Sequence, residues 1–167
     1  MSDETSASGP PMRRKNRRRI ARYGPLLVWL SLIFFASSGE LSSPHTSRLT
    51  RPLLQLFFPF LSEEQFALLH YLIRKTAHFT EYAILAMLAA RAFLSSSHHI
   101  LRRHWFSIVL ISVAIYALLD EYHQSFVPAR EASIYDSLLD TVGGTTALAL
   151  IALWRAARNR QGKKPRL

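Results

Sequence analysis

The sequence predicts an all-α fold, a four-helix transmembrane bundle with an extra interfacial or projecting helical segment between the first and second spans. Three observations support this prediction: four strongly apolar windows, basic clusters that adjoin them, and turn-forming residues between them. The hydrophobic content of the 167 residues is 49%, which is ordinary for a soluble protein. The prediction therefore depends on how the apolar residues are distributed and not on their amount.

The net charge of +10 comes mainly from the two ends of the chain, which hold 13 of the 21 Lys and Arg residues. Basic clusters next to apolar spans are typical of the cytoplasmic side of a membrane protein. We therefore expect a multi-pass protein of the cell membrane with N- and C-termini in the cytoplasm. A lipid-headgroup patch is a weaker alternative. No nucleic-acid partner is expected, because no RNA-binding or zinc-finger motif is present.

Three regions follow from this pattern. Residues 1–22 are expected to be a disordered basic cytoplasmic tail, 23–155 the transmembrane domain, and 156–167 a second basic cytoplasmic tail. The basic residues followed by an apolar run also fit a secretory signal peptide. The polar leader and the lack of a clear cleavage site favour a retained first helix.

The first half of the transmembrane domain contains one span and one short apolar segment. The span covers 23–38, and the Gly, Ser and Pro residues in 39–52 predict a loop. The segment 53–61 is too short to cross and is interrupted by Pro59, so we expect it at the interface or capping the bundle.

The second helix is expected to begin at a capping box formed by Ser62 and Gln65. Its pattern continues to Leu94, about 48 Å of helix, which exceeds one crossing. We therefore expect 63–74 to project or lie on the surface and the crossing to begin near Lys75.

The remaining spans are separated by clear polar segments. A basic turn at 95–104 precedes the third span, whose uncharged run covers 105–119, and the fourth span covers 132–154. Gly143 and Gly144 in the fourth span would allow close helix packing.

A polar layer is predicted near the outer ends of the second, third and fourth spans. One ionisable residue of each lies about 20–25 Å above a basic residue at the inner end of the same helix. These pairs are His78 with Arg91, Asp120 with Arg103, and Asp140 with Arg155. The hydrocarbon core is about 30 Å thick, so the three residues fall in one layer just inside its outer boundary.

Insertion of an ionisable side chain at such depth in the membrane costs roughly 2.5–3.5 kcal/mol of free energy. Residues of this kind are normally found at functional sites. Helical spacing gives each of the three helices one polar face toward the others. The candidate catalytic residues are His78, Asp120 and Asp136. The candidate substrate-binding residues are Arg74, Lys75, Glu81, Tyr82, Glu121, Gln124, Arg130 and Asp140.

Acidic residues outnumber basic residues in this layer, so one carboxyl is expected to be protonated or neutralised by a cationic ligand group. Glu81 is the expected protonated carboxyl. A divalent metal held by His78, Glu81, His123 and the aspartates is an alternative, but the neighbouring Lys and Arg would compete for the acids. No metal or cofactor is expected. Polar side chains that only join helices by hydrogen bonds are a further alternative.

At the residues of this layer, the chain resembles the VanZ-like family of bacterial membrane proteins. The resemblance depends on two blocks, RKTAHFTEY at 74–82 and DEYHQSFVPAR at 120–130, followed by Asp136, Asp140 and Gly143. The match of two separated blocks is specific and covers about 25–155. Ala129 departs from the pattern, since many relatives have Gly there, so the turn around 127–130 is expected to differ slightly.

The resemblance implies a four-helix membrane protein whose founding member is associated with low-level resistance to the glycopeptide antibiotic teicoplanin. It implies no established reaction, and resistance by this chain is an analogy. We expect membrane lipids as partners, with a lipid-linked cell-wall precursor or a lipoglycopeptide as the candidate ligand. A membrane-embedded hydrolase or transferase that uses His78 as general base, oriented by Asp120 or Asp136, is the alternative. A purely structural helper is a third class.

Overall fold

The computed structural model describes residues 11–38, 43–128 and 133–161. These parts contain no strand and form six helices. The helices are α1 (Pro11–Ser37), α2 (Ser43–Phe57), α3 (Glu63–Leu94), α4 (His99–Arg103), α5 (Trp105–Gln124) and α6 (Ile134–Gln161). The predicted all-α fold is confirmed for the described residues.

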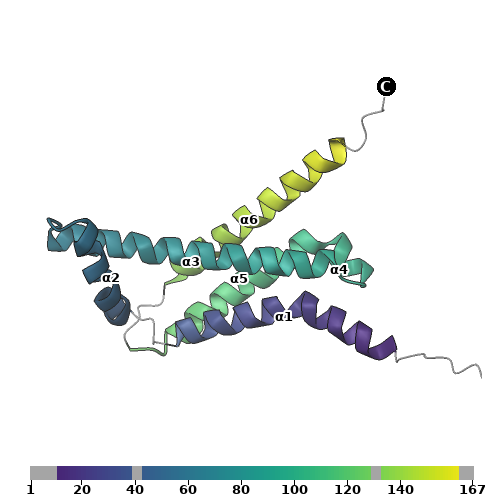
Figure 1. The fold of residues 1–167 in the computed structure, drawn as a ribbon, viewed down its shortest axis with the longest axis horizontal. Helices are drawn as coiled ribbons and strands as arrows, with labels where there is room; N and C mark the ends of the chain where they lie inside the picture. The colour runs from purple at the N-terminus through teal and green to yellow at the C-terminus, as the bar shows by residue number, and fades with distance from the viewer. Residues whose placement is uncertain (1–10, 39–42, 129–132, 162–167) are drawn as a thin grey trace, which may run out of the picture.

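The four long helices alternate in direction along the molecule (Figure 1). The start of α1, the short α4 and the end of α6 lie toward one end, on the right of Figure 1. The end of α1, the start of α3, the end of α5 and the start of α6 lie toward the other end. Helix α6 packs most extensively on α3 and then on α5.

In the described part of the chain, three helices are long and apolar enough to cross a membrane: Asn16–Ser37 within α1, α5 and α6. Helix α3 is long enough but is not among them. Its two longest uncharged stretches, residues 65–73 and 82–90, are short because Arg74, Lys75 and Glu81 lie between them and Arg91 ends the second. Crossing by α3 therefore stays a prediction.

The core is formed where α3, α5 and α6 meet, and small side chains keep these helices close. Ala86 of α3 and Ala117 of α5 are fully buried, as are Val109 and Leu148. A Cβ atom added at Gly143 would lie 2.3 Å from the carbonyl oxygen of Phe79, closer than real Cβ contacts allow. The predicted packing role of this glycine is thus confirmed.

The helix boundaries differ from the prediction at the start of α1 and at α2. Helix α1 begins at Pro11, so the tail expected to be disordered is helical from that residue onward. Helix α2 covers most of the predicted loop and ends before Pro59, with Pro52 inside it. Leu54 is the buried apolar residue of this helix, whereas Leu53 and Leu56 are exposed.

The long second helix agrees with the sequence. The Ser62 hydroxyl accepts a hydrogen bond from the backbone N–H of Gln65, and the Gln65 side chain accepts one from the backbone N–H of Ser62. This capping box begins α3, which continues unbroken to Leu94. The predicted basic turn contains the short helix α4.

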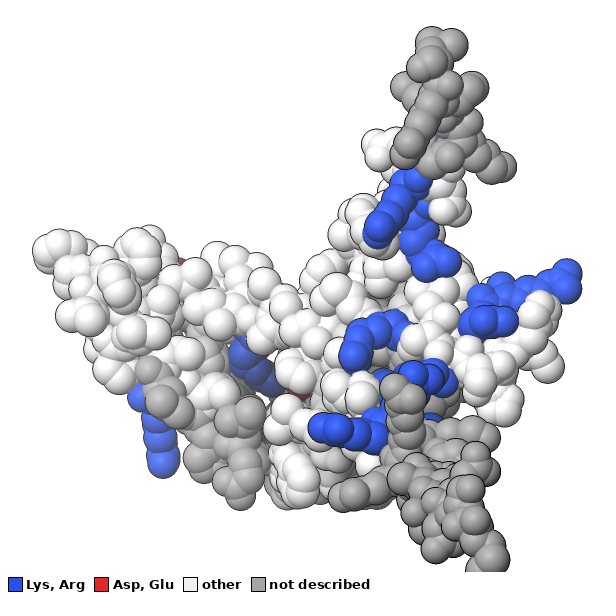
Figure 2. All heavy atoms as spheres, turned by 45° about the vertical axis from the view of Figure 1, so that its right-hand side comes forward, with Lys and Arg blue, Asp and Glu red and all other residues white. Residues whose placement is uncertain are grey.

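Lys and Arg gather at the end of the molecule that holds the start of α1, helix α4 and the end of α6 (Figure 2). The exposed described members of this basic end are Arg17, Arg18, Arg19, Arg91, Arg102, Arg103, Arg155, Arg158 and Arg160. The three basic segments thus share one end in space. Their assignment to the cytoplasm stays a prediction.

Candidate functional site

The site is centred on Asp140, which α6 carries to the face packed against α3 and α5. Its side chain is 0% exposed, and Oδ1 lies 3.8 Å from Nδ1 of His78 on α3. No hydrogen-bond donor in the described residues reaches either carboxyl oxygen of Asp140. Tyr82, one turn along α3 from His78, is also fully buried and lies close to the carboxyl groups of Asp120 and Asp140. The predicted meeting of the three helices at one polar layer is therefore observed.

Asp120 is held by its own helix. The side-chain amide of Gln124, one turn further along α5, donates to Oδ2 of Asp120 at 2.9 Å. The same amide nitrogen lies 3.4 Å from the hydroxyl of Ser37 on α1. All three residues are buried. This network joins α1 to α5, and Asp120 is engaged by Gln124.

Ser37 was missed by the sequence analysis, although a signal for it exists. It lies one turn after Ile33, and both side chains are almost completely buried. A polar residue that continues the buried face of a membrane helix is a candidate for the interior.

Glu121 connects α5 to the start of α6. Its Oε2 accepts a hydrogen bond from the backbone N–H of Ser133 at 2.9 Å, and the side chain is buried. Backbone N–H groups near a helix start need such acceptors. We infer that Glu121 has a structural role as the acceptor that fixes this corner. Arg130, also a predicted site residue, lies outside the described residues.

Lys75 and Asp136 form an ion pair that joins α3 to α6. Their side chains are 24% and 28% exposed, so the pair is partly shielded from solvent. Asp136 pairs with Lys75 and Asp120 with Gln124, while the carboxyl of Asp140 lies 3.8 Å from Nδ1 of His78. An orienting role of Asp120 or Asp136 stays a prediction, and Asp140 is a further candidate for that role.

A small polar chamber lies beside His78. Its volume is about 130 Å³, and it is lined by Ala36, Ser37, Thr46, Arg74, Ala77, His78 and Glu81. It therefore brings together side chains of α1, α2 and α3. Three of the predicted site residues, Arg74, His78 and Glu81, line it.

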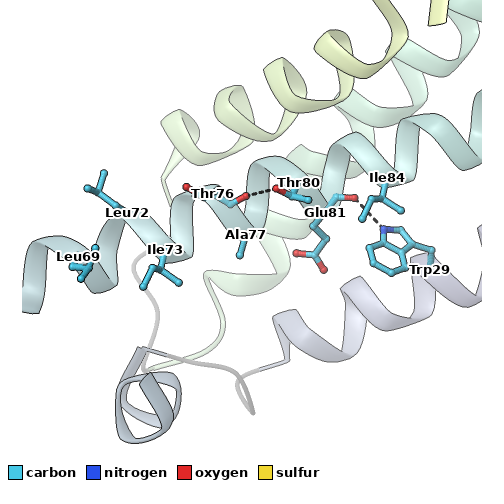
Figure 3. Close-up of a pocket in the computed structure, with 9 residues that line it drawn as sticks. All are labelled: Trp29, Leu69, Leu72, Ile73, Thr76, Ala77, Thr80, Glu81 and Ile84. Carbon is cyan, nitrogen blue, oxygen red and sulfur yellow. Dashed lines mark hydrogen bonds between the residues drawn. The ribbon is translucent and has the colours of Figure 1, made fainter. Parts of the chain in front are cut away.

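An apolar groove of about 660 Å³ continues from this chamber between α1 and α3 (Figure 3). The two cavities share Ala77 and Glu81. The indole N–H of Trp29 donates to the backbone carbonyl of Glu81 at 3.0 Å and so fixes α1 against α3 at the groove. A polar compartment and an apolar compartment are thus contiguous.

The most deeply buried carboxyl of the layer is Asp140 and not Glu81. Glu81 is only half-buried and lines both cavities. The sequence predicted Glu81 as the protonated carboxyl, but the position of a residue along a helix does not give the direction of its side chain. Neutralisation by a proton or a cationic group therefore concerns Asp140 first.

The arrangement does not favour the metal alternative. In the part of the chain that the structure describes, no group of three or more His, Cys, Asp or Glu residues could hold a metal ion. His123, one of the proposed ligands, stacks its ring on Phe34 of α1, with ring centroids 4.7 Å apart.

Helix α2 is attached to the projecting part of α3 by a histidine that the sequence analysis did not single out. Nε2 of His70 lies 3.3 Å from Oγ1 of Thr46, and its ring stacks on Phe66. Burial, and then the positive charge of Arg74, lower the pKa of His70 below its ordinary value. Thr46 also lines the chamber, so this contact supports one of its walls.

The comparisons with known proteins agree with this architecture. No curated protein and no solved structure matches the chain. A family model described as VanZ/LLP1 matches residues 23–155, which is most of the chain and includes every described residue of the polar layer. The chain therefore belongs to the VanZ/LLP1 family.

Proposed function

We propose that this chain is a four-crossing protein of the bacterial cell envelope whose polar layer binds an amphiphile near the extracytoplasmic face of the membrane. Candidate ligands are a lipid-linked cell-wall intermediate and the lipid tail of an antibiotic. Binding of either would be the physical basis for a contribution to glycopeptide resistance of the teicoplanin type.

The observation that carries this proposal is the contact between the polar chamber and the apolar groove. An amphiphile needs both environments within one molecular length, and ligand sites are typically apolar cavities with a few placed polar groups. The chamber supplies Arg74 and His78, and the groove supplies Trp29 and Ile84.

Helix directions support the fourth crossing. Helix α1 ends and α5 begins at opposite ends of the molecule, and α3 connects them (Figure 1). If α1 and α5 both cross the membrane, the chain has to return between them. Polar residues in a crossing helix are tolerated where they face protein or a cavity, as Tyr82 does.

Binding of labelled lipid intermediates to purified protein tests the proposal. We expect saturable binding that is weakened at least about tenfold in Arg74→Ala and in Asp120→Asn, a loss of about 1.4 kcal/mol. Arg91→Ala is the matched control, because Arg91 lies on the same helix at its other end. Equal binding by all four proteins would contradict the proposal.

The second candidate function is a membrane-embedded hydrolase or transferase that acts on a lipid phosphate or ester. The proximity of His78 and Asp140 favours it, since Nδ1 lies 3.8 Å from the carboxyl group and the imidazole can act as a general base that takes a proton at Nε2. A water would lose that proton to Nε2 and attack the phosphorus or carbonyl carbon, and the bond to the leaving group would break. Turnover by proteoliposomes that disappears in His78→Ala would favour this candidate.

A further inference from the structure

We infer that the chamber and the groove together form a subsite for a lipid with a terminal phosphate monoester, with the phosphate against Arg74 and His78 and the chain between α1 and α3. The inference rests on the proposed function and narrows its ligand to a chemical class. Three features support it separately: the size of the chamber, the charge of the groups that line it, and the adjoining groove.

The chamber is large enough for a phosphate group. Its volume is about 130 Å³, and on this measure a single water needs only roughly 10–15 Å³.

Arg74 and His78 are the groups of the chamber that would hold a phosphate, whereas Glu81, which lines the same chamber, has to be protonated when an anion binds there. Arg74 has no carboxylate partner among the described residues, whereas its neighbour Lys75 is paired with Asp136. A guanidinium binds phosphate oxygens with two parallel hydrogen bonds. Ser37 and Thr46 bring hydroxyl groups to the same wall, and His78 brings an imidazole.

The groove suits the chain of the same molecule. Its α3 wall extends from Leu69 to Ile84, about 22 Å at 1.5 Å per residue. Figure 3 shows Leu69, Ile73 and Ile84 along α3, with Trp29 of α1 next to Ile84 at one end of the groove. Because Ala77 and Glu81 belong to both cavities, a chain that leaves the chamber enters the groove directly.

Quenching of Trp29 fluorescence tests the inference. The chain has three tryptophans, so Trp105→Phe with Trp154→Phe leaves Trp29 as the only fluorophore. In nanodiscs of phosphatidylcholine, dibrominated phosphatidic acid should quench Trp29 at about a tenfold lower mole fraction than dibrominated phosphatidylcholine. Arg74→Gln should remove this preference, and Arg91→Gln should keep it. Equal quenching by both lipids in the parent protein would overturn the inference.

A second pair of variants tests the groove separately. Ala77→Phe fills the junction of the two cavities and should abolish the preferential quenching. Thr146→Phe is its control, because Thr146 lines a different apolar groove between α3 and α6. Unchanged preference in Ala77→Phe would overturn the placement of the chain.

Further measurements distinguish a lipid phosphate from free inorganic phosphate. They also distinguish failure of this inference from failure of the proposed function. Inorganic phosphate should not displace the brominated lipid, and full displacement by it would overturn the need for a chain. Saturable binding of amphiphiles without any headgroup preference would refute this inference and leave the proposed function standing. Absence of saturable binding by every amphiphile would refute both.

Discussion

The Nδ1 atom of His78 lies 3.8 Å from Oδ1 of Asp140, a carboxyl group fully buried between α3, α5 and α6. No described donor hydrogen-bonds to this carboxyl. An ionised carboxylate without a donor is costly in such a place, so selection for stability alone would favour a neutral residue there. We therefore expect Asp140 to serve the function of the protein.

Asp140→Asn separates function from stability. The amide keeps the shape and removes the charge, so we expect an unchanged or higher unfolding temperature and normal abundance. Ligand binding should weaken at least about tenfold, because an amide cannot exchange a proton beside His78 as a carboxyl group can. Thermal unfolding and lipid binding measured on the same preparation check this. A variant that binds as well as the parent protein would support a purely structural helper.

Gly143→Ala should destabilise the protein, because its Cβ would lie 2.3 Å from the backbone oxygen of Phe79. Neither helix backbone can yield locally, so we expect a loss of roughly 1–3 kcal/mol, typical of overpacking. Gly144→Ala should cost less, since its nearest atom is a side-chain methyl of Val113 at 2.7 Å.

Gly24→Ala is the matched control for this series. Its new methyl would meet only Ile20 at 3.8 Å, and alanine favours a helix over glycine by up to about 1 kcal/mol. Unfolding temperatures in detergent should therefore fall for Gly143→Ala and stay equal or rise for Gly24→Ala. The reverse order would refute the close approach of α3 and α6.

The ion pair of Lys75 and Asp136 should show measurable coupling in a double-mutant cycle. Both side chains are about three-quarters buried, so removal of one partner leaves the other charge poorly solvated. With Lys75→Met and Asp136→Asn, we expect the double variant to be more stable than the sum of the single effects predicts, by about 1 kcal/mol or more.

The exposed pair of Arg51 and Glu63 provides the comparison. Its side chains are 44% and 77% exposed, and pairs of this kind contribute about 0–1 kcal/mol. The coupling energy should therefore be smaller than that of Lys75 and Asp136. Equal coupling of the two pairs would mean that the polar layer is open to solvent.

Acidification should loosen α2 from α3 through His70. Its pKa is lowered in the folded protein, so below the ordinary value of about 6.5 the unfolded or detached form binds more protons. The contact is therefore fully stable above this pH and weakens as the pH falls toward the lowered pKa. Spin labels on cysteines at Arg48 and Leu68, both exposed, should report a broader distance distribution at acidic pH.

His70→Gln is the control for this titration. Glutamine can still hydrogen-bond to Thr46 but does not titrate in this range. Its distance distribution should not change between neutral and mildly acidic pH. A pH response that survives in His70→Gln would assign the effect to another group.

Much of the polar layer was predictable because helical spacing is regular. Counting residues from the basic end of each helix placed His78 and Asp140 at the same depth, and they are in contact. The same count could not tell which carboxyl meets His78. That depends on helix rotation, which the close packing at Gly143 determines.

Other features escaped the sequence because they depend on contacts between distant segments. Helix α2 was predicted partly as a loop, since Pro and Ser in its first turns are typical of loops while its apolar face emerges later. The hydrogen bond from Trp29 to the carbonyl of Glu81 left no pattern in the sequence. The chamber combines three helices and could not be foreseen from any one of them.

Cysteine accessibility in intact cells tests the central claim most directly, that α3 crosses the membrane and brings its polar residues to those of α5 and α6. The chain has no native cysteine, so single cysteines at Ser62, Ser125 and Ser97 are unambiguous reporters. An impermeant maleimide should label positions 62 and 125 from outside and position 97 only after permeabilisation. Labelling of positions 62 and 97 from the same side would contradict the account.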